Sequence, residues 1–382
     1  MPFFTFEDAK TSFNLFCCMY GIGTLGMPGN FSRAGPVIAV IAMAFMAFAN
    51  IYSSVKMSQV ILLAPKSVKT FGDLGEWSMG KWGRWLCVIS QMGSCLLIPC
   101  VFLVLGGSLL DGLFPDAFSA TVWIILMALM VLPVCLIPTL KEGAGAAFAG
   151  CMGTIIADVI GVAVVMYGMR GHPTVPSPDL KISQVLGCFG NLALAYGAGI
   201  VIPDLQPADM EVGLGYAEST TPAIVQTESR RSSKMSYVSV ADSEREFKDD
   251  PEAEAAEYRG GKNTIKYIAL RVVIVAILVV LSIIFQDHFS DFSDFVGASC
   301  ITTNCILLPI VFYLMKAWRT IPIYEKAAAL IVTVVCFVLG CYVTYTTGKS
   351  LFTPTNDDTE FPYCGSEYEN QIYYNYTAEH ES

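Results

Sequence analysis

The sequence predicts an all-α, polytopic membrane protein with about nine transmembrane helices. The chain of 382 residues is 54% hydrophobic and only 15% charged, which is too apolar for a soluble domain. Its mean hydropathy is +0.55, so the lipid bilayer is the predicted solvent for most of the fold. The runs that can cross a bilayer, about 17 to 25 apolar residues each, lie at residues 13–31, 36–62, 86–110, 120–140, 146–168, 184–203, 265–285, 295–315 and 327–347.

Composition and motifs exclude several other classes of protein. The net charge of -10 argues against nucleic acid as a partner, because the phosphate backbone repels an acidic chain. Twelve of the 13 cysteines lie in apolar runs, which predicts no disulfide framework. No Cys/His spacing fits a metal site, and no run carries a nucleophile with a base or a paired carboxylate motif. We therefore expect no bound cofactor and no enzymatic activity.

The first run is apolar but, over residues 14–31, contains four glycines and Pro28. Within it Gly21 to Gly26 spell G-x-G-x-x-G, the motif of a dinucleotide-binding loop. That function is not expected here, because no strand pattern precedes the motif and no Asp or Glu occurs from Ala9 until Asp73. Two interpretations remain. The glycines either permit close packing of helices, or they break the helix inside the membrane and free backbone groups that lipid cannot satisfy.

The sixth run repeats this anomaly, since LGCFGNLALAYGAGIVIPDL at residues 186–205 contains four glycines and Pro203. Two glycine-interrupted spans indicate an inverted-repeat transporter, in which broken helices meet the substrate near the bilayer midplane. The N-terminus of a half-helix carries about half a positive charge and can hold a carboxylate, whereas exposed carbonyls can hold an ammonium or a cation. An α-amino acid presents both groups and is the predicted substrate. Close helix packing remains the alternative for these glycines too.

Asp158 is the ionisable residue that lies deepest in an apolar run, within residues 146–168. Charges inside a bilayer are costly, so such a residue is a candidate for function. Asp158 is predicted either to accept a proton or bind a coupling cation, with H+ or Na+ as the coupling ion, or simply to form a hydrogen bond with a neighbouring helix. Lys56 lies closer to the predicted cytoplasmic end of its run, where it is expected to snorkel toward water.

The distribution of Lys and Arg predicts a cytoplasmic N-terminus, because this orientation places ten basic residues near span ends inside and four outside. An odd number of spans makes the C-terminus extracytoplasmic, where the sequon at Asn375 is either accessible to glycosylation or unused. A disordered cytoplasmic loop is predicted between the sixth and seventh runs, and its SRRSS segment is either merely solvated, as most such basic segments are, or a site of regulation by phosphorylation. The predicted organisation is transmembrane helices 1–6 at residues 1–203, the loop at 204–264, transmembrane helices 7–9 at 265–347 and an acidic tail at 348–382.

Several ordered segments together resemble the amino acid/auxin permease family. They are NLFCCMYGIGTLGMPGNFSRAG in the first run, FGDLGEWSMGKWGR before the third, LKEGAGAAFAG entering the fifth, LALAYGAGIVIPDLQ in the sixth and FVGASCITTNCILLPIVFYL in the eighth. The resemblance implies a LeuT-type inverted-repeat fold with eleven helices that moves neutral amino acids coupled to protons or sodium. It further implies that the substrate site is lined by Tyr20, Gly21, Ile22, Gly23, Thr24, Ala195, Tyr196, Gly197 and Ala198.

The sequence departs from the family pattern in two places. Many members have Gly-His after the Ala-Tyr of helix six, whereas Gly197 and Ala198 follow Tyr196 here. Two helices of the usual eleven, the seventh and eighth, have no counterpart, which makes the second repeat incomplete. We expect a secondary active amino acid transporter in the plasma membrane or a vacuolar or other endomembrane, working by alternating access. The alternative is a transport-inactive truncated paralogue that acts as an amino acid sensor or interaction protein.

Overall fold

The computed structural model describes a large part of the chain, and every structural statement below concerns these residues. Most of the predicted loop at 204–264 and of the tail at 348–382 lies outside them. The described residues are 16, 20–65, 68, 70–114, 117–136, 140–168, 182–197, 199, 202 and 261–352, with side chains left aside at 22, 24, 25, 140–147, 183, 261 and 262.

All regular elements in these ranges are helices, and five of them are long and apolar enough to cross a membrane. This confirms the predicted class of all-α, multi-pass integral membrane protein. The helices are α2 (Ile22–Leu63), α3 (Phe71–Met79), α4 (Lys81–Leu113), α5 (Ala120–Cys135), α6 (Leu140–Gly168), α7 (Ile182–Ala195), α12 (Gly261–Phe285), α13 (Phe289–Val296), α14 (Leu308–Ala317) and α15 (Ile323–Phe352).

Helix α2 contains the later part of the first predicted run and the whole of the second. The two parts meet at a bend at Gly35, whose φ of 71° and ψ of 163° are non-helical. A positive φ is strained for any residue with a Cβ, so glycine is required here. Pro36 follows directly and supplies no backbone N–H to continue the hydrogen bonding of the preceding turn. The bend therefore lets the chain change direction between two predicted spans without an intervening loop.

The short helix α3 begins with a capping box. Thr70 accepts a hydrogen bond from the Asp73 backbone N–H, and the Asp73 carboxylate accepts one from the Thr70 N–H. These two bonds satisfy N–H groups that a helix N-terminus leaves without partners. Gly80, with φ of 72°, then turns the chain into α4. Trp82 at the start of α4 is 86% exposed, which suits the predicted position at the membrane interface.

The eighth predicted run is not a uniform α-helix. Between α13 and α14 the chain forms two π-helical segments, η3 (Gly297–Ile301) and η4 (Thr303–Leu307). The Thr302 hydroxyl between them donates a hydrogen bond of 2.9 Å to the Gly297 carbonyl. Segments of π-helix are rare and occur often at functional sites. A 3-10 segment, η2 (Gln286–His288), separates α12 from α13.

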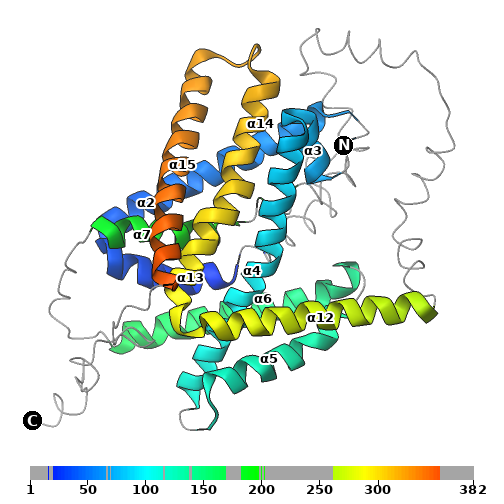
Figure 1. The fold of residues 1–382 in the computed structure, drawn as a ribbon. Coiled ribbons are helices and arrows are strands. Elements are labelled where there is room, and N and C mark those ends of the chain that lie inside the picture. Colours follow the sequence, from blue (N-terminus) through cyan, green and yellow to red (C-terminus); the bar gives the residue numbers. More distant parts are fainter. Residues whose placement is uncertain are drawn as a thin grey trace, which may run out of the picture.

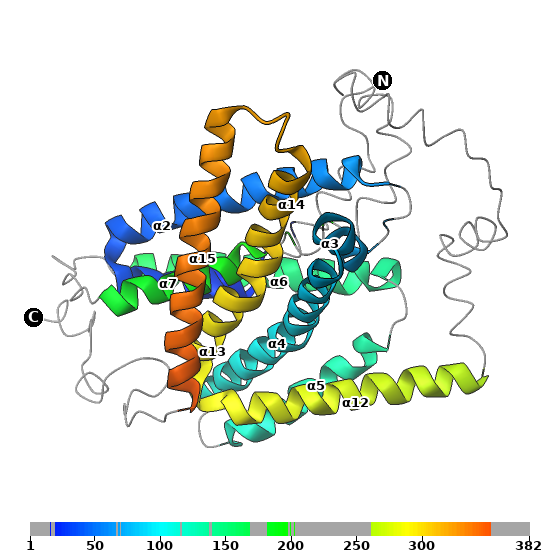
Figure 2. The same ribbon diagram turned by 45° about the horizontal axis from the view of Figure 1, so that its top comes forward.

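The arrangement brings the first and last parts of the chain together. Helix α2 packs along α7, and both contact the π-helical part of the α13–α14 segment. In Figure 1, α14 and α15 form an upright pair, while α5 and α12 lie across its lower end; Figure 2 shows the same arrangement after rotation. One buried cluster joins α2, α7, η3, α14 and α15. It includes Met46, Leu192, Ile301, Phe312 and Val332.

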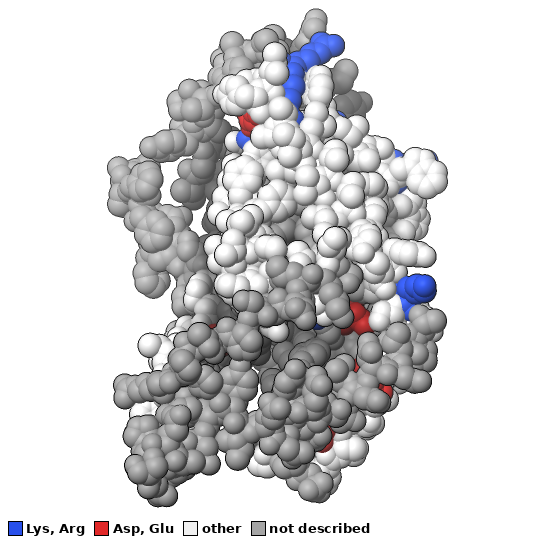
Figure 3. All heavy atoms as spheres, turned by 90° about the vertical axis from the view of Figure 1, so that its left-hand side faces the viewer, with Lys and Arg blue, Asp and Glu red and all other residues white. Residues whose placement is uncertain are grey.

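Uncharged side chains make up most of the described surface on the face shown in Figure 3. Large apolar residues are exposed along whole helices, for example Val159, Val162 and Val165 on α6. Such continuous exposure would be a liability in water. It is the expected outer surface of helices that are solvated by lipid.

Candidate functional site

The two glycine-interrupted segments contact each other. Gly23 in the first turn of α2 is buried, and a Cβ added to it would lie 2.5 Å from the Ala195 Cα at the end of α7. One turn further along α2, a Cβ on Gly26 would lie 2.7 Å from the Asn191 side-chain nitrogen. No side chain can be inserted at these positions without a shift of the neighbouring atoms. Glycine is therefore needed for the close approach of α2 and α7.

This contact brings two helix ends of opposite polarity together. Helix α2 begins at Ile22 and α7 ends at Ala195. The first N–H groups of a helix give its N-terminus a partial positive charge, and the last carbonyls give its C-terminus a partial negative charge. Among the described residues, nothing lies within 4 Å of a Cβ placed on Gly21, which leaves space beside it. The junction thus has the polarity that a carboxylate and an ammonium of one small molecule require.

The chain beyond α7 packs against the π-helical segments. A Cβ on Gly197 would lie 2.8 Å from the Ile301 side chain of η3, and one on Gly199 would lie 3.2 Å from Cys305 of η4. The Cys305 thiol also donates a hydrogen bond of 3.3 Å to the Gly197 carbonyl. One carbonyl freed by the end of α7 is therefore satisfied by the π-helical wall. This contact was not predictable from the sequence, because a π-helix has no distinctive residue pattern.

Asp158 lies beside the start of α2. The Tyr20 hydroxyl, directly before the break, donates a hydrogen bond of 2.8 Å to a carboxylate oxygen of Asp158 on α6. The Tyr20 ring also stacks on Phe16, with ring centroids 5.2 Å apart. The half-buried Asp158 thus bonds to the segment before α2. The predicted coupling candidate and the predicted substrate segment are next to each other.

The structure places only some of the predicted site residues. Gly21, Gly23, Ala195, Tyr196 and Gly197 lie at the junction of the two segments, and the Tyr196 side chain is half-buried. The side chains of Ile22 and Thr24 and the whole of Ala198 lie outside the described residues. A lining role for any of these residues stays a prediction.

A buried polar network joins α4 to η4 behind the junction. The Ser90 hydroxyl donates a hydrogen bond of 2.6 Å to the Asn304 carbonyl oxygen, and the Asn304 amide donates one of 2.9 Å to Ser94. All three residues are buried. Asn191 likewise accepts a bond from Asn30 at 3.4 Å. Asn191 and Asn304 thus form hydrogen bonds between helices. Among the described residues no group of His, Cys, Asp and Glu could hold a metal ion.

An ion pair lies beside the bend of α2 at Gly35, on the predicted extracytoplasmic side. Arg33 forms a salt bridge of 2.8 Å with Asp294 of α13 and also donates a hydrogen bond to Ser290. Asp294 is only 3% exposed. Helix α7 passes beside the pair, since a Cβ on Gly187 would lie 3.6 Å from the Asp294 carboxylate. The pair therefore ties α2 to α13 where both approach α7.

A second ion pair lies toward the C-terminal end of α2. Lys56 forms a salt bridge of 2.5 Å with Glu325 of α15, and Tyr313 of α14 donates a hydrogen bond of 2.9 Å to the same carboxylate. Lys56 is 8% exposed, so the expectation that it snorkels to water was wrong. The sequence showed Lys56 as a charged residue within the apolar run at 36–62, whereas Glu325 lies just before the run at 327–347. It did not show which charges are partners.

Comparison with known proteins gives one family match. The model of the family described as transmembrane amino acid transporter protein matches residues 9–210 and 224–351. A curated relative, amino acid transporter AVT1I of Arabidopsis thaliana, is 29% identical over 132 residues. That match covers 31% of this chain and 32% of the relative, so it spans only about a third of either protein. No solved structure matches the chain significantly.

Proposed function

The chain belongs to the transmembrane amino acid transporter family, and from this premise we propose that it carries neutral amino acids across a membrane by secondary active transport. The observation that supports this best is the contact of Gly23 with Ala195. It joins the positive end of α2 to the negative end of α7, as the ends of broken helices do at a transporter midplane. The curated relative is named an amino acid transporter, which agrees with this class of substrate.

The substrate would bind through its two charged ends. The carboxylate would accept hydrogen bonds from the N–H groups at the start of α2, beside the space at Gly21. The ammonium would donate hydrogen bonds to carbonyl oxygens at the end of α7 near Ala195. These backbone groups recognise only the carboxylate and the ammonium, which all α-amino acids share. Selection for neutral side chains then depends on the apolar residues around the junction, and no buried charge is needed there to bind the side chain.

Asp158 is the proposed coupling residue. As a carboxylate it accepts a charge-assisted hydrogen bond from Tyr20, and such bonds are about twice as strong as neutral ones. Binding of a proton would weaken this bond and release the segment before α2. In this way the ion gradient would act on the helix end that holds the substrate. Sodium in place of the proton would act by the same displacement of Tyr20.

The two ion pairs are the contacts that we propose break and re-form in turn as the molecule opens toward one side of the membrane and then the other. Arg33 with Asp294 lies beside the bend of α2, Lys56 with Glu325 lies near its C-terminal end, and both pairs join α2 to C-terminal helices. Opening toward one side requires separation of the pair on that side while the other holds. We assign the Arg33 pair to the extracytoplasmic side, in accord with the cytoplasmic N-terminus that the Lys and Arg distribution predicts.

The test is uptake by the purified full chain in liposomes. We expect saturable uptake of a labelled neutral amino acid that rises under an inward proton or sodium gradient and falls when an ionophore dissipates it. Uptake that is non-saturable and independent of both gradients would contradict the proposal. Substrate binding in detergent without any uptake would favour a sensor over a transporter.

A further inference from the structure

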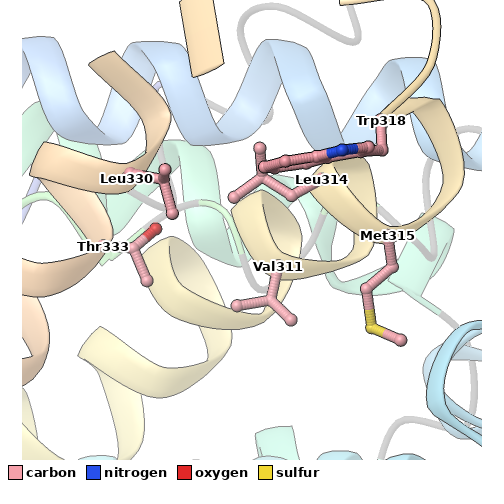
Figure 4. Close-up of a pocket in the computed structure, with 6 residues that line it drawn as sticks. All are labelled: Val311, Leu314, Met315, Trp318, Leu330 and Thr333. Atoms are coloured by element: carbon pink, nitrogen blue, oxygen red, sulfur yellow. The ribbon is translucent and has the colours of Figure 1, made fainter. Parts of the chain in front are cut away.

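An apolar groove lies between α14 and α15, away from the junction of α2 and α7. It encloses about 390 Å³ and is lined by Val311, Leu314, Met315, Trp318, Leu330 and Thr333. Figure 4 shows four of these side chains following one face of α14 and the other two projecting from α15. The first and last of the four are seven residues apart, so the groove runs about 10 Å along the helix.

Apart from the Trp318 indole, the lining residues of the groove offer a ligand no free side-chain hydrogen-bond donor. Thr333 contributes the one hydroxyl, which donates a hydrogen bond of 2.8 Å to the Ala329 carbonyl of its own helix. Met315 is 52% exposed and Leu330 is 44% exposed. The groove therefore opens to the surroundings of the helical hairpin that α14 and α15 form. In a bilayer these surroundings are acyl chains. A hydrocarbon chain is therefore the ligand that the floor of the groove fits.

One end of the groove carries a cation. Lys326 lies on the same face of α15 as Leu330, one turn earlier, and its ammonium is 4.8 Å from the centre of the Trp318 ring. Within the part of the chain that the structure describes, Lys326 has no carboxylate partner, in contrast to Lys56. Arg319 is exposed next to Trp318. An indole with an adjacent ammonium is typical of the level of lipid headgroups.

We propose that this groove binds an anionic glycerophospholipid, with an acyl chain between α14 and α15 and its phosphate at Lys326 and Arg319. The hairpin end with these residues is predicted to face the cytoplasm, where the leaflet contains anionic lipids. The neighbour of Lys326 is Glu325, which holds Lys56. A bound lipid therefore braces the end of α15 that carries this ion pair.

The proposal is tested on the full chain in detergent micelles with phosphatidylserine that carries brominated acyl chains, which quench nearby tryptophans. We expect saturable quenching that is largely lost in Trp318→Phe, the groove tryptophan. Lys326→Gln should weaken the apparent affinity for phosphatidylserine roughly fivefold, the effect of one basic residue near an anionic surface. Lys326→Arg should retain it, and Lys266→Gln, which removes an exposed charge on α12, should leave it unchanged.

Two further measurements separate the groove from its surroundings. Thr333→Phe fills the groove and should abolish saturable quenching, whereas brominated phosphatidylcholine should bind the wild-type chain more weakly than phosphatidylserine. Equal binding of both lipids, or an unchanged affinity in both Lys326→Gln and Thr333→Phe, would overturn the proposal. So would a chain that is dimeric in detergent and becomes monomeric in Thr333→Phe, because the groove would then hold a second copy.

Discussion

Lys56 and Glu325 form an ion pair of 2.5 Å that joins α2 to the start of α15. Tyr313 of α14 completes the cluster, since its hydroxyl bonds to Glu325 and its ring lies 4.4 Å from the Lys56 ammonium. Helix α2 and the consecutive helices α14 and α15, which are distant from it in sequence, thus meet at one charge cluster. Removal of one partner leaves the other charge buried without compensation, which is costlier than never having had the pair.

Glu325→Gln should destabilise the chain by about 3 kcal/mol, the low end for a broken buried pair because Glu325 is partly exposed. Equilibrium unfolding in mixed micelles measures this loss. The control replaces both charges, as Lys56→Met with Glu325→Leu, and should be close to neutral because no unpaired charge remains. An equal loss in the double variant would show that the effect comes from packing and not from an uncompensated charge.

Gly23→Val should abolish uptake and leave membrane insertion intact. The valine side chain meets Ala195, so it pushes the start of α2 away from the end of α7 and separates the two helix ends that we propose bind the substrate. Uptake in liposomes and the amount of folded protein in the membrane are the measurements.

The matched control for this change is Gly29→Val. Gly29 lies in the same helix, two turns on, and nothing lies within 4 Å of a Cβ placed there. It should keep most of the uptake, because only intrinsic helix propensity changes. Loss of uptake in both variants would mean that α2 tolerates no β-branched residue, and normal uptake in Gly23→Val would remove Gly23 from the site.

The helices and the position of the first break were predictable from local sequence. Length and hydropathy determine which segments can cross a bilayer, and Gly35 with Pro36 marks the bend between the first two runs. The glycines at Gly21 and Gly23 predict an interrupted helix, and α2 indeed begins at Ile22. These features depend on residues within a few turns of one another.

The side-chain partners were not predictable in the same way. Asp158 bonds to Tyr20, and Lys56 pairs with Glu325. The sequence contains several other polar or charged residues that could have been the partners of each. Which charges meet depends on how the helices pack, and that packing depends on contacts across the whole chain. The π-helical turns at Gly297 and Thr303 differ from α-helix only by a shift in hydrogen bonding, for which residue types give no signal.

Asp158→Asn should uncouple transport from the gradient. The amide can still accept the Tyr20 hydrogen bond but cannot change its charge, so exchange of labelled for unlabelled substrate should persist while gradient-driven uptake falls at least tenfold. Tyr20→Phe removes the bond of 2.8 Å and should weaken coupling in a proton gradient without abolishing binding. The two changes should be non-additive in a double-mutant cycle. Additive losses would mean that Tyr20 and Asp158 act independently.

Asp294→Asn should open the predicted extracytoplasmic end of the molecule selectively. A hydrogen bond to a charged group contributes about 1.5 to 3 kcal/mol, so weakening the contact with Arg33 should raise the open population tenfold or more. Hydrogen–deuterium exchange of the full chain measures this as faster exchange in α13 and in α7 near Gly187, with α15 near Glu325 unchanged.

Glu325→Gln should produce the mirror image, with faster exchange at the start of α15 and none of the change near Gly187. This opposition is what distinguishes gates from ordinary stabilising contacts, because a shared structural role would raise exchange throughout the molecule in either variant. Uniform acceleration in both variants would therefore remove the ion pairs from the alternating mechanism. A reciprocal pattern would mean that α2 moves between two states, held beside its bend by Arg33 in one and near its C-terminal end by Lys56 in the other.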